Sequence, residues 1–305
     1  MTSELVRRPD LADALLAEAR ERTDARLEDW AARLRDRIPG REGAAVAYAL
    51  QSPGKRVRAA LVIAAYRSLG GRSDAIDGVA AAVETVHAYS LVHDDLPCMD
   101  DDSLRRGRPT THRAFDVPTA TRAGFLLVPV AAEVLADAAD QLSLAPSVLG
   151  RMAAELFQAG GVEGMVGGQW LDLEAEGRQL APDDLVAVHR AKTGALIRAA
   201  CILGALAART DAPGLAALAD FGADIGLAFQ IADDVLDATG TSETLGKTAG
   251  KDHEVAKSTY VSVLGVDAAR AEANRLASRA VTRLHGHPDP SALVALAGYI
   301  VTRSS

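Results

Sequence analysis

Residues 87–112 read HAYSLVHDDLPCMDDDSLRRGRPTTH, and this stretch decides how the rest of the chain is interpreted. It holds five aspartates within nine positions, followed directly by three arginines: Asp94, Asp95, Asp100, Asp101, Asp102, Arg105, Arg106 and Arg108. Carboxylates this close together repel one another unless cations lie between them. Mg²⁺ prefers oxygen ligands and also binds phosphate groups, and arginine donates to phosphate oxygens in pairs. The stretch therefore predicts a metal and a phosphorylated ligand; the alternative is a charged loop in solvent.

A second group of aspartates lies in an otherwise apolar segment, FQIADDVLD, at residues 229–237. Asp233 and Asp237 are four residues apart, so a helix places them on one face, with Asp234 three residues from Asp237. Like charges at this spacing destabilise a helix unless they are compensated. A metal would relieve the repulsion in both groups at once, so the two groups together favour a metal site over a solvated loop.

Composition narrows the class of protein. The chain has 305 residues, of which 49% are hydrophobic and 24% charged, with a net charge of −8. This length suffices for a sizeable core, and the acidic balance argues against a general nucleic-acid binder. Cys98 and Cys201 are far apart and favour a reduced, cytoplasmic setting. We expect no signal peptide, and the apolar run at 125–132 is too short to span a membrane.

Apolar residues recur with the period of a helix along almost the whole chain, and few stretches alternate as strands do. We predict one all-α domain over residues 1–305, with about ten helices and no internal linker or repeat. The first helix runs from residue 11 to residue 38 and ends at Pro39-Gly40. The others cover 42–51, 55–69, 74–94, 117–139, 146–165, 183–208, 213–238, 252–263, 267–285 and 290–302.

Three further segments place cations beside glycine. Lys55 and Arg58 lie where a turn enters a helix, so exposed N–H groups favour anions there, although a plain basic helix start gives the same pattern. Lys192 precedes Gly194 in mid-helix, where glycine costs about 1 kcal/mol relative to alanine. We therefore expect close packing or a distortion at that point. Lys247 lies on a glycine-punctuated loop that either closes over a phosphate or is merely solvated.

Two polar positions lie close to these motifs. His87 is two helical turns before Asp94 on nearly the same face, so we assign it to the site rather than to ordinary polar packing. Gln169 and Asp172 form a polar pair in the glycine-rich run GMVGGQWLDLE. The glycines of that run are explained more simply by a tight helix crossing.

Taken together, these motifs resemble those of the trans-polyprenyl diphosphate synthases over nearly the full length of the chain. The residues that carry the resemblance are Gly54-Lys55-x-x-Arg58, His87 to Asp100, Leu104-Arg105-Arg106-Gly107, Gly167-Gly168-Gln169-x-x-Asp172, Lys192-Thr193-Gly194, Phe229-Gln230-x-x-Asp233-Asp234-x-x-Asp237 and Gly246-Lys247. Each motif is short, but their order and spacing are specific. The resemblance implies an all-α bundle, usually a homodimer, with both aspartate motifs facing a central cavity.

The resemblance also implies a reaction, the Mg²⁺-dependent head-to-tail condensation of isopentenyl diphosphate with an allylic diphosphate such as dimethylallyl or geranyl diphosphate. Mg²⁺ would bind the allylic diphosphate and stabilise it as it leaves. The metal ligands implied are Asp94, Asp95, Asp100, Asp233, Asp234 and Asp237. The cations implied to grip the same diphosphate are Arg105, Lys192 and Lys247. The residues implied to hold isopentenyl diphosphate without metal are Lys55, Arg58, His87 and Arg106. Thr193 and Gln230 would direct oxygen dipoles at the developing cation, and no protein base is required.

Product length depends on the residues just before Asp94. Tyr89 and Ser90 lie about 6–8 Å deeper along the helix, at ~1.5 Å per residue, so the Tyr89 ring should block a longer tail. Pro97 should break the helix between Asp95 and Asp100. With these features the chain resembles bacterial farnesyl diphosphate synthases. We therefore expect farnesyl diphosphate as product, with geranylgeranyl diphosphate the close alternative and geranyl diphosphate behind it.

One position departs from the family pattern, and two other functions compete. Many relatives have Asp after Gly124, where this chain has Phe125; the change bears on a helix contact, a subunit interface or the pocket wall. A terpene cyclase normally mixes Asn, Ser or Thr with Glu in its second metal motif, which Asp233, Asp234 and Asp237 do not match. A non-catalytic partner subunit should have lost an aspartate motif, and both motifs are present.

Overall fold

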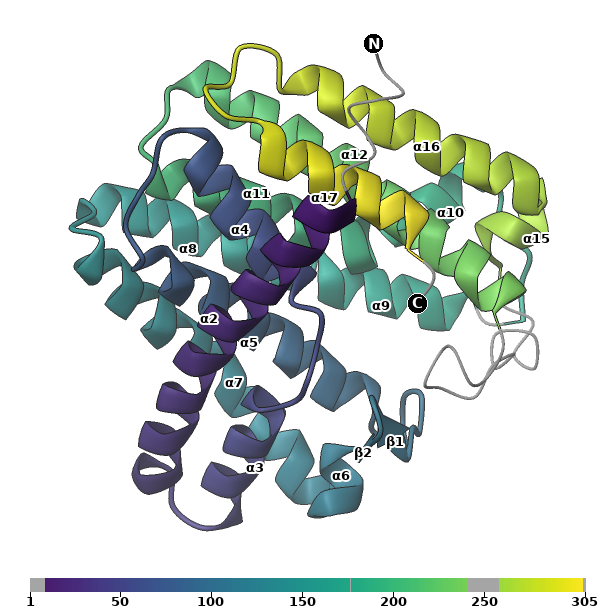
Figure 1. The fold of residues 1–305 in the computed structure, drawn as a ribbon. Helices are drawn as coiled ribbons and strands as arrows, with labels where there is room; N and C mark the ends of the chain where they lie inside the picture. Colours follow the sequence, from purple (N-terminus) through teal and green to yellow (C-terminus); the bar gives the residue numbers. More distant parts are fainter. Residues whose placement is uncertain (1–8, 176, 241–257, 304–305) are drawn as a thin grey trace.

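The computed structural model describes residues 9–175, 177–240 and 258–303 (Figure 1). The helices before residue 142 are α2 (Pro9–Arg37), α3 (Arg41–Leu50), α4 (Val57–Ser68), α5 (Ile76–Asp94), α6 (Thr111–Ala114) and α7 (Val117–Gln141). Those that follow are α8 (Pro146–Gly160), α9 (Met165–Glu174), α10 (Pro182–His189), the π-helical η1 (Arg190–Gly194), α11 (Ala195–Ala207), α12 (Ala212–Thr239), α15 (Tyr260–Leu264), α16 (Val266–Arg283) and α17 (Ser291–Thr302). Within the described ranges, strands occur in one hairpin, β1 (Leu104–Arg105) with β2 (Arg108–Pro109).

The all-α prediction is confirmed, and most predicted helices begin and end within two residues of the observed ones. Two long predictions were wrong in detail. The expected helix 146–165 ends at Gly160, and α9, which was not predicted, begins at Met165 after a glycine-containing break. The expected helix 183–208 is interrupted by η1. Half of the expected helix 252–263 lies outside the described residues, and within the other half α15 begins at Tyr260. The extent of the domain over residues 1–305 stays a prediction.

Two helices organise the core. α5 packs against α2, α3, α4 and α7, while α11 packs against α4, α8 and α12. Many of the buried side chains are alanines, which let helix axes approach closely. A second cluster of buried apolar side chains joins α12 to α15 and α16. In Figure 1, α16 and α17 lie on one side of the bundle, and both contact α12. Both aspartate motifs thus end long helices anchored in the core.

Local sequence signals set where several helices begin. Asp116 caps α7, because its carboxylate accepts a hydrogen bond from the Thr119 N–H at 2.7 Å, and Asp211 caps α12 in the same way through Gly214 N at 2.9 Å. A proline follows each cap within the first turn, where a missing N–H costs nothing.

α12 is long and apolar enough to cross a membrane by length and composition. Its most apolar window is 56% buried within the protein. It contacts α10, α11, α15, α16 and α17 and η1. These contacts explain its apolar composition as that of a core helix.

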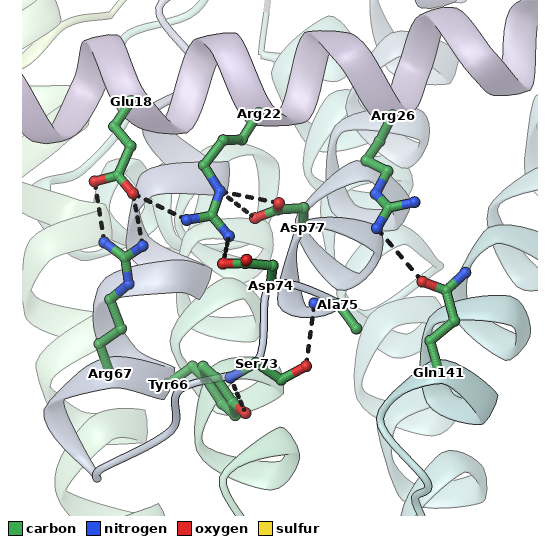
Figure 2. Close-up of polar contacts among 10 residues, drawn as sticks. All are labelled: Glu18, Arg22, Arg26, Tyr66, Arg67, Ser73, Asp74, Ala75, Asp77 and Gln141. Carbon is green, nitrogen blue, oxygen red and sulfur yellow. Dashed lines mark hydrogen bonds and ion pairs between the residues drawn. The ribbon is translucent and has the colours of Figure 1, made fainter.

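A cluster of charged residues fastens α2 to α4 and α5 (Figure 2). The Arg22 Nε donates to both carboxylate oxygens of Asp77 at 2.9 and 3.1 Å, and its Nη2 donates to Asp74 at 2.6 Å. Arg67 binds Glu18 through two nitrogens, at 2.6 and 3.0 Å. The hydrogen bond and charge of Arg67 outweigh the effect of burial and lower the pKa of Glu18 to about 2.

We predict that Glu18→Gln lowers stability at neutral pH and that the difference from the wild type shrinks in acid. A depressed carboxyl pKa stabilises the fold fully above the unfolded value of about 4.5. This contribution is lost as pH falls through the folded value of about 2. Because Glu18 is partly exposed and solvent screens the pair, the difference at pH 7 should be under about 1 kcal/mol. Urea unfolding at pH 7 and at stepwise lower pH measures it; a difference that grows on acidification would contradict this.

Candidate active site

The first aspartate motif begins where α5 ends. α5 stops at Asp94, three residues before Pro97, and the following loop folds back, with Asp100 N–H donating to the Asp94 carbonyl at 2.9 Å. Asp101 N–H reaches the Leu96 carbonyl at 3.1 Å, with a left-handed backbone at Asp101 (φ 47°). The backbone therefore brings Asp94 and Asp100 together, as the sequence predicted. Cys98 lies exposed on the same loop, whereas Cys201 is buried in α11 and burial raises its pKa to about 12.

This motif gathers several carboxylates, two of them buried at the end of α5. Burial raises the pKa of Asp94 and of Asp95 to about 6, and neighbouring carboxylates add to the effect. The Arg105 Nε donates to Asp95 at 2.5 Å, and its Nη2 donates to Asp102 at 3.2 Å. Arg105 is thus bound to the aspartate loop, and Asp95 is only 3% exposed. A nearby cation favours the charged form of buried carboxylates, so the motif is suited to receive one.

The hairpin that follows positions Arg106. Its two turn residues, Arg106 and Gly107, both have positive φ (52° and 75°), as a two-residue hairpin turn of type I′ requires. The Arg106 Nη1 donates to the Pro53 carbonyl at 2.5 Å, which joins the hairpin to the segment containing Lys55. Arg106 and His87 both line a pocket between α3, α5 and the hairpin.

His87 lies in the field of several arginines. Burial, and then the charges of Arg58, Arg106, Arg56 and Arg105, lower its pKa well below the usual value. A neutral imidazole among guanidinium groups leaves a net positive surface, which attracts an anion. Arg58 Nε is buried and has no hydrogen-bond partner within the described part of the chain.

The charge of the second motif acts on Lys55 and Arg58. The charge of Asp233 opposes the fall in pKa that burial causes in both residues. Neither lines the pocket that His87 and Arg106 share. The charges of Arg58 and Arg106 act on His87, and that of Arg106 acts on Lys55. The four residues assigned to isopentenyl diphosphate are called the cationic group below.

A buried ion pair that the sequence analysis missed holds the turn of Lys55 and Arg58. Arg56 adopts a left-handed backbone (φ 53°) and is 7% exposed. Its guanidinium donates to Asp24 at 2.7 Å, to Glu84 at 3.2 Å and to the Ser52 carbonyl at 2.8 Å. Glu84 also accepts from the Ala59 N–H at 3.2 Å. The positive φ needs such over-determination, because left-handed backbone is unfavourable outside glycine.

The distortion predicted near Gly194 is confirmed as a π-helical turn, η1, and the glycines of the GGQ run make a tight crossing there. A Cβ on Gly168 would lie 2.2 Å from the backbone nitrogen of Lys192, so only glycine fits. At this crossing the Lys192 Nζ donates to Asp172 at 2.6 Å. Lys192 also lowers the pKa of Asp94, so its charge acts on the first motif.

The second motif lies near the end of α12, and its three aspartates have different surroundings. Asp234 is 6% exposed and accepts from Gln230 Nε2 at 3.0 Å and from the Tyr260 N–H at 2.8 Å. The Thr193 hydroxyl donates to Gln230 Oε1 at 2.8 Å, which links η1 to α12. Asp233 and Asp237 remain partly exposed on the helix face.

Arg303, which follows α17, was missed by the sequence analysis. Its Nη2 donates to Asp233 at 2.5 Å and to the Phe229 carbonyl at 3.3 Å, and the guanidinium lies 3.9 Å from the centre of the Phe229 ring. No motif in the sequence marks this residue, because its role depends on where α17 packs against α12. It supplies a positive charge at the position where the sequence predicts a metal.

The side chains of the two residues assigned to product length, Tyr89 and Ser90, have different surroundings. The Ser90 hydroxyl donates back to the His87 carbonyl at 2.8 Å and is buried. Tyr89 is partly buried, and both burial and the charge of Asp94 raise its pKa. The charge of Asp94 therefore acts on the Tyr89 side chain, whereas the Ser90 hydroxyl is hydrogen-bonded within its own helix.

Comparison with known proteins decides the family. Residues 43–289 match the family model for polyprenyl synthetase. The chain belongs to the polyprenyl synthetase family. It is 47% identical over 256 residues to farnesyl diphosphate synthase of Escherichia coli (82% of this chain, 85% of the relative). It is 41% identical to the large subunit 1 of a heterodimeric geranylgeranyl pyrophosphate synthase of Arabidopsis thaliana (86% and 72%).

A solved structure agrees with the fold of this polyprenyl synthetase. The geranyltransferase of Helicobacter pylori, in complex with magnesium and isoprenyl diphosphate, superposes with a TM-score of 0.77 at 30% identity. The match covers 96% of this chain and 95% of that one.

The structure does not bring every predicted residue into one group. Among residues 9–175, 177–240 and 258–303, no three His, Cys, Asp or Glu side chains gather closely enough to hold a metal ion by themselves. Lys247 lies outside the described residues. The polyprenyl synthetase motifs thus form two carboxylate groups with cations beside each, rather than a single ready-made cage.

We predict that Gly168→Ala destabilises the protein by about 1–3 kcal/mol, since the added methyl group meets backbone that cannot yield cheaply. Gly150→Ala is the matched control: it is exposed in α8, with nothing within 4 Å of the added Cβ. This control should be neutral or stabilising by up to about 1 kcal/mol. Urea unfolding compares them, and equal stability of the two variants would disprove the tight crossing.

Proposed function

We propose that this chain is a prenyltransferase that joins isopentenyl diphosphate head-to-tail to dimethylallyl and then geranyl diphosphate, giving farnesyl diphosphate. The observation that carries the proposal is the arrangement of buried carboxylates and cations. Asp94 lies in the field of Lys192, while Asp233 lies in that of Lys55 and Arg58. Membership of the polyprenyl synthetase family and the resemblance to relatives named farnesyl diphosphate synthase support it.

The residues fit Mg²⁺. They offer hard carboxylate oxygens, and burial, with a smaller contribution from neighbouring carboxylates, raises the pKa of Asp94 and Asp95. Mg²⁺ is typically held by one or two carboxylates together with substrate phosphates and water, so a group of three protein ligands is not required. We assign Asp94, Asp100, Asp233 and Asp237 to the metal. When bound, the metal would neutralise the diphosphate as its bond to the allylic carbon weakens.

Asp95 and Asp234 act more indirectly in this proposal. Asp95 is fixed by Arg105, and Asp234 is fixed by Gln230 and the Tyr260 N–H. Both carboxylates are almost fully buried. We infer that they hold the neighbouring ligands Asp94 and Asp233 in position, as outer-sphere partners do in metal sites.

The cations divide between two diphosphates. Lys192 and Arg105 lie beside the first aspartate motif and would bind the allylic diphosphate, with Lys247 assigned to it by sequence alone. The cationic group would bind isopentenyl diphosphate without metal; its members are Lys55, Arg58, Arg106 and neutral His87. Guanidinium groups suit this task, because their planar donors match phosphate oxygens.

Thr193 and Gln230 are placed to stabilise positive charge. The Thr193 hydroxyl proton is directed to Gln230 Oε1, so the lone pairs of Thr193 Oγ1 remain available to a developing allylic cation. Gln230 in turn donates to Asp234, which fixes the direction of its amide. Dipoles fixed before the reaction stabilise charge without reorganising. The proton released after the alkene attacks needs no protein base if the departed diphosphate accepts it.

Two further features belong to the proposal. Geranylgeranyl diphosphate is the alternative product, favoured by the relatives of that name in Arabidopsis thaliana. We also propose a cytoplasmic homodimer without a stable membrane anchor. The dimer is supported by several large apolar side chains exposed around α9: Val162, Val166, Trp170 and Leu171. Sedimentation equilibrium of the purified chain tests the dimer.

Incubation with isopentenyl diphosphate, Mg²⁺ and each of dimethylallyl, geranyl and farnesyl diphosphate tests the reaction. We predict farnesol as the end product after dephosphorylation, with farnesyl diphosphate not extended, because the Tyr89 ring, five residues before Asp94 on the same helix, should block a longer tail. Mass spectrometry sizes the products, and EDTA should abolish their formation. Geranylgeraniol would show that the floor lies deeper than Tyr89. A lack of elongation from all three starters would reject the prenyltransferase itself.

Two variants, Asp233→Asn and Asp234→Asn, should distinguish a metal ligand from a residue that holds the ligand in position. Losing a ligand should cost about 3–4 kcal/mol of transition-state stabilisation, a ~10²–10³-fold fall in kcat, with little change in unfolding. Asp234→Asn leaves a buried donor unsatisfied, which should cost about 1–3 kcal/mol of stability. Steady-state kinetics and urea unfolding are measured on both variants. If Asp233→Asn lost stability and Asp234→Asn did not, the two assignments would have to be exchanged.

A further inference from the structure

Three aromatic side chains form a continuous row from α5 to α7. The centroids of the Tyr89 and His93 rings are 5.0 Å apart at an interplanar angle of 69°, and those of His93 and Phe125 are 5.3 Å apart at 90°. Both contacts are edge-to-face, the arrangement that aromatic rings prefer. Tyr89 and His93 are four residues apart on α5, so they occupy one helix face. Phe125 reaches the row from the opposite helix.

The middle ring is held in one orientation. His93 Nε2 lies 3.2 Å from the Thr121 carbonyl, which can only accept, so Nε2 carries the proton in this contact. A Cβ on Gly124 would lie 2.0 Å from that nitrogen, so the ring occupies the space that a side chain would fill. His93 is therefore seated in a slot of α7 formed by Thr121 and Gly124, and Phe125 covers one side of it.

The outer ring, Phe125, is otherwise poorly supported. Its side chain is 65% exposed, among the highest values for large apolar residues in the described part of the chain. It belongs to no motif used in the proposed reaction. Its ring contacts the His93 ring, so an effect of Phe125 on Tyr89 can pass through His93.

From this row we propose that Phe125 is a positioning residue for product length, which acts through His93 to hold the Tyr89 ring in the path of the growing tail. The inference rests on the proposed function and deepens it. Tyr89 lies five residues before Asp94, about 7–8 Å along the helix, where the tail of a growing chain arrives. Its ring stops the tail only if it resists displacement, and the seated His93 supplies that resistance. Phe125 prevents His93 from swinging outward.

Phe125→Leu keeps an apolar side chain but removes the ring, whereas Phe125→Tyr keeps the ring. With geranyl diphosphate as starter, Phe125→Leu should raise the ratio of geranylgeranyl to farnesyl product three- to tenfold, and Phe125→Tyr should restore the wild-type ratio. That change corresponds to about 0.6–1.4 kcal/mol. Val117→Ala, an exposed apolar position on the same helix, is the matched control and should leave the ratio unchanged.

Gly124→Ala tests the same row without touching Phe125. The new methyl group displaces the His93 ring, so the product ratio should shift in the same direction as in Phe125→Leu. Mass spectrometry of dephosphorylated products gives the ratio, and sedimentation shows whether each variant keeps the oligomeric state of the wild type. A shift in Phe125→Leu accompanied by dissociation would assign Phe125 to a subunit contact and overturn the proposal.

Two other results would also overturn it: an unchanged ratio in Phe125→Leu, or a shift in Phe125→Tyr as large as that in Phe125→Leu. The wild type serves as the test of the underlying reaction. If it elongates no starter, the proposed function has failed; if it elongates and the variants match it, only the role of Phe125 has failed.

Discussion

The burial of neighbouring carboxylates is the constraint on which this structure depends. Asp94 and Asp95 lie at the end of a core helix, where burial raises their pKa to about 6. Each motif is flanked by cations. Arg105 from the same segment and Lys192 from η1 lie beside the first motif, and Arg303, which follows α17, lies beside the second. None of these cations is in excess, since each is already engaged with a carboxylate of its own. The folded chain is thus prepared for additional positive charge, and substrate diphosphates would enter together with it.

The helices meet this constraint by holding the motifs on rigid supports. α5 and α12 are buried along most of their length, so their ends are well fixed. The π-helical turn η1 points its side chains in directions that differ from those of a regular helix. Lys192 thereby reaches Asp172, and Thr193 reaches Gln230. π-helical turns are frequently found at functional sites. Here the distortion is possible because glycines on α9 and α12 allow close backbone approach.

Much of this was predictable from sequence because it is local. Helix limits follow from caps, prolines and apolar period, and the glycine at 194 correctly indicated a distortion. The break between α8 and α9 was missed because glycines within a periodic segment are compatible with either a continuous helix or a turn. The partners of Arg56, Asp234 and Arg303 were not predictable, since each contact joins elements far apart in the sequence. The carboxylate motifs were recognised in the sequence because clustered aspartates require a nearby cation. Which of these aspartates are exposed and which are hydrogen-bonded depends on how the helices pack, so that division was not predicted.

The two cysteines have a practical value for spectroscopy. Cys98 is exposed on the loop between Asp95 and Asp100, while Cys201 is enclosed in α11 with a thiol that resists ionisation. Because thiolates react with maleimides and thiols do not, one dye molecule should attach at Cys98 without any engineered change. Its fluorescence would then report in real time on the loop as ligands bind. Reducing agent during purification would keep this natural attachment point intact.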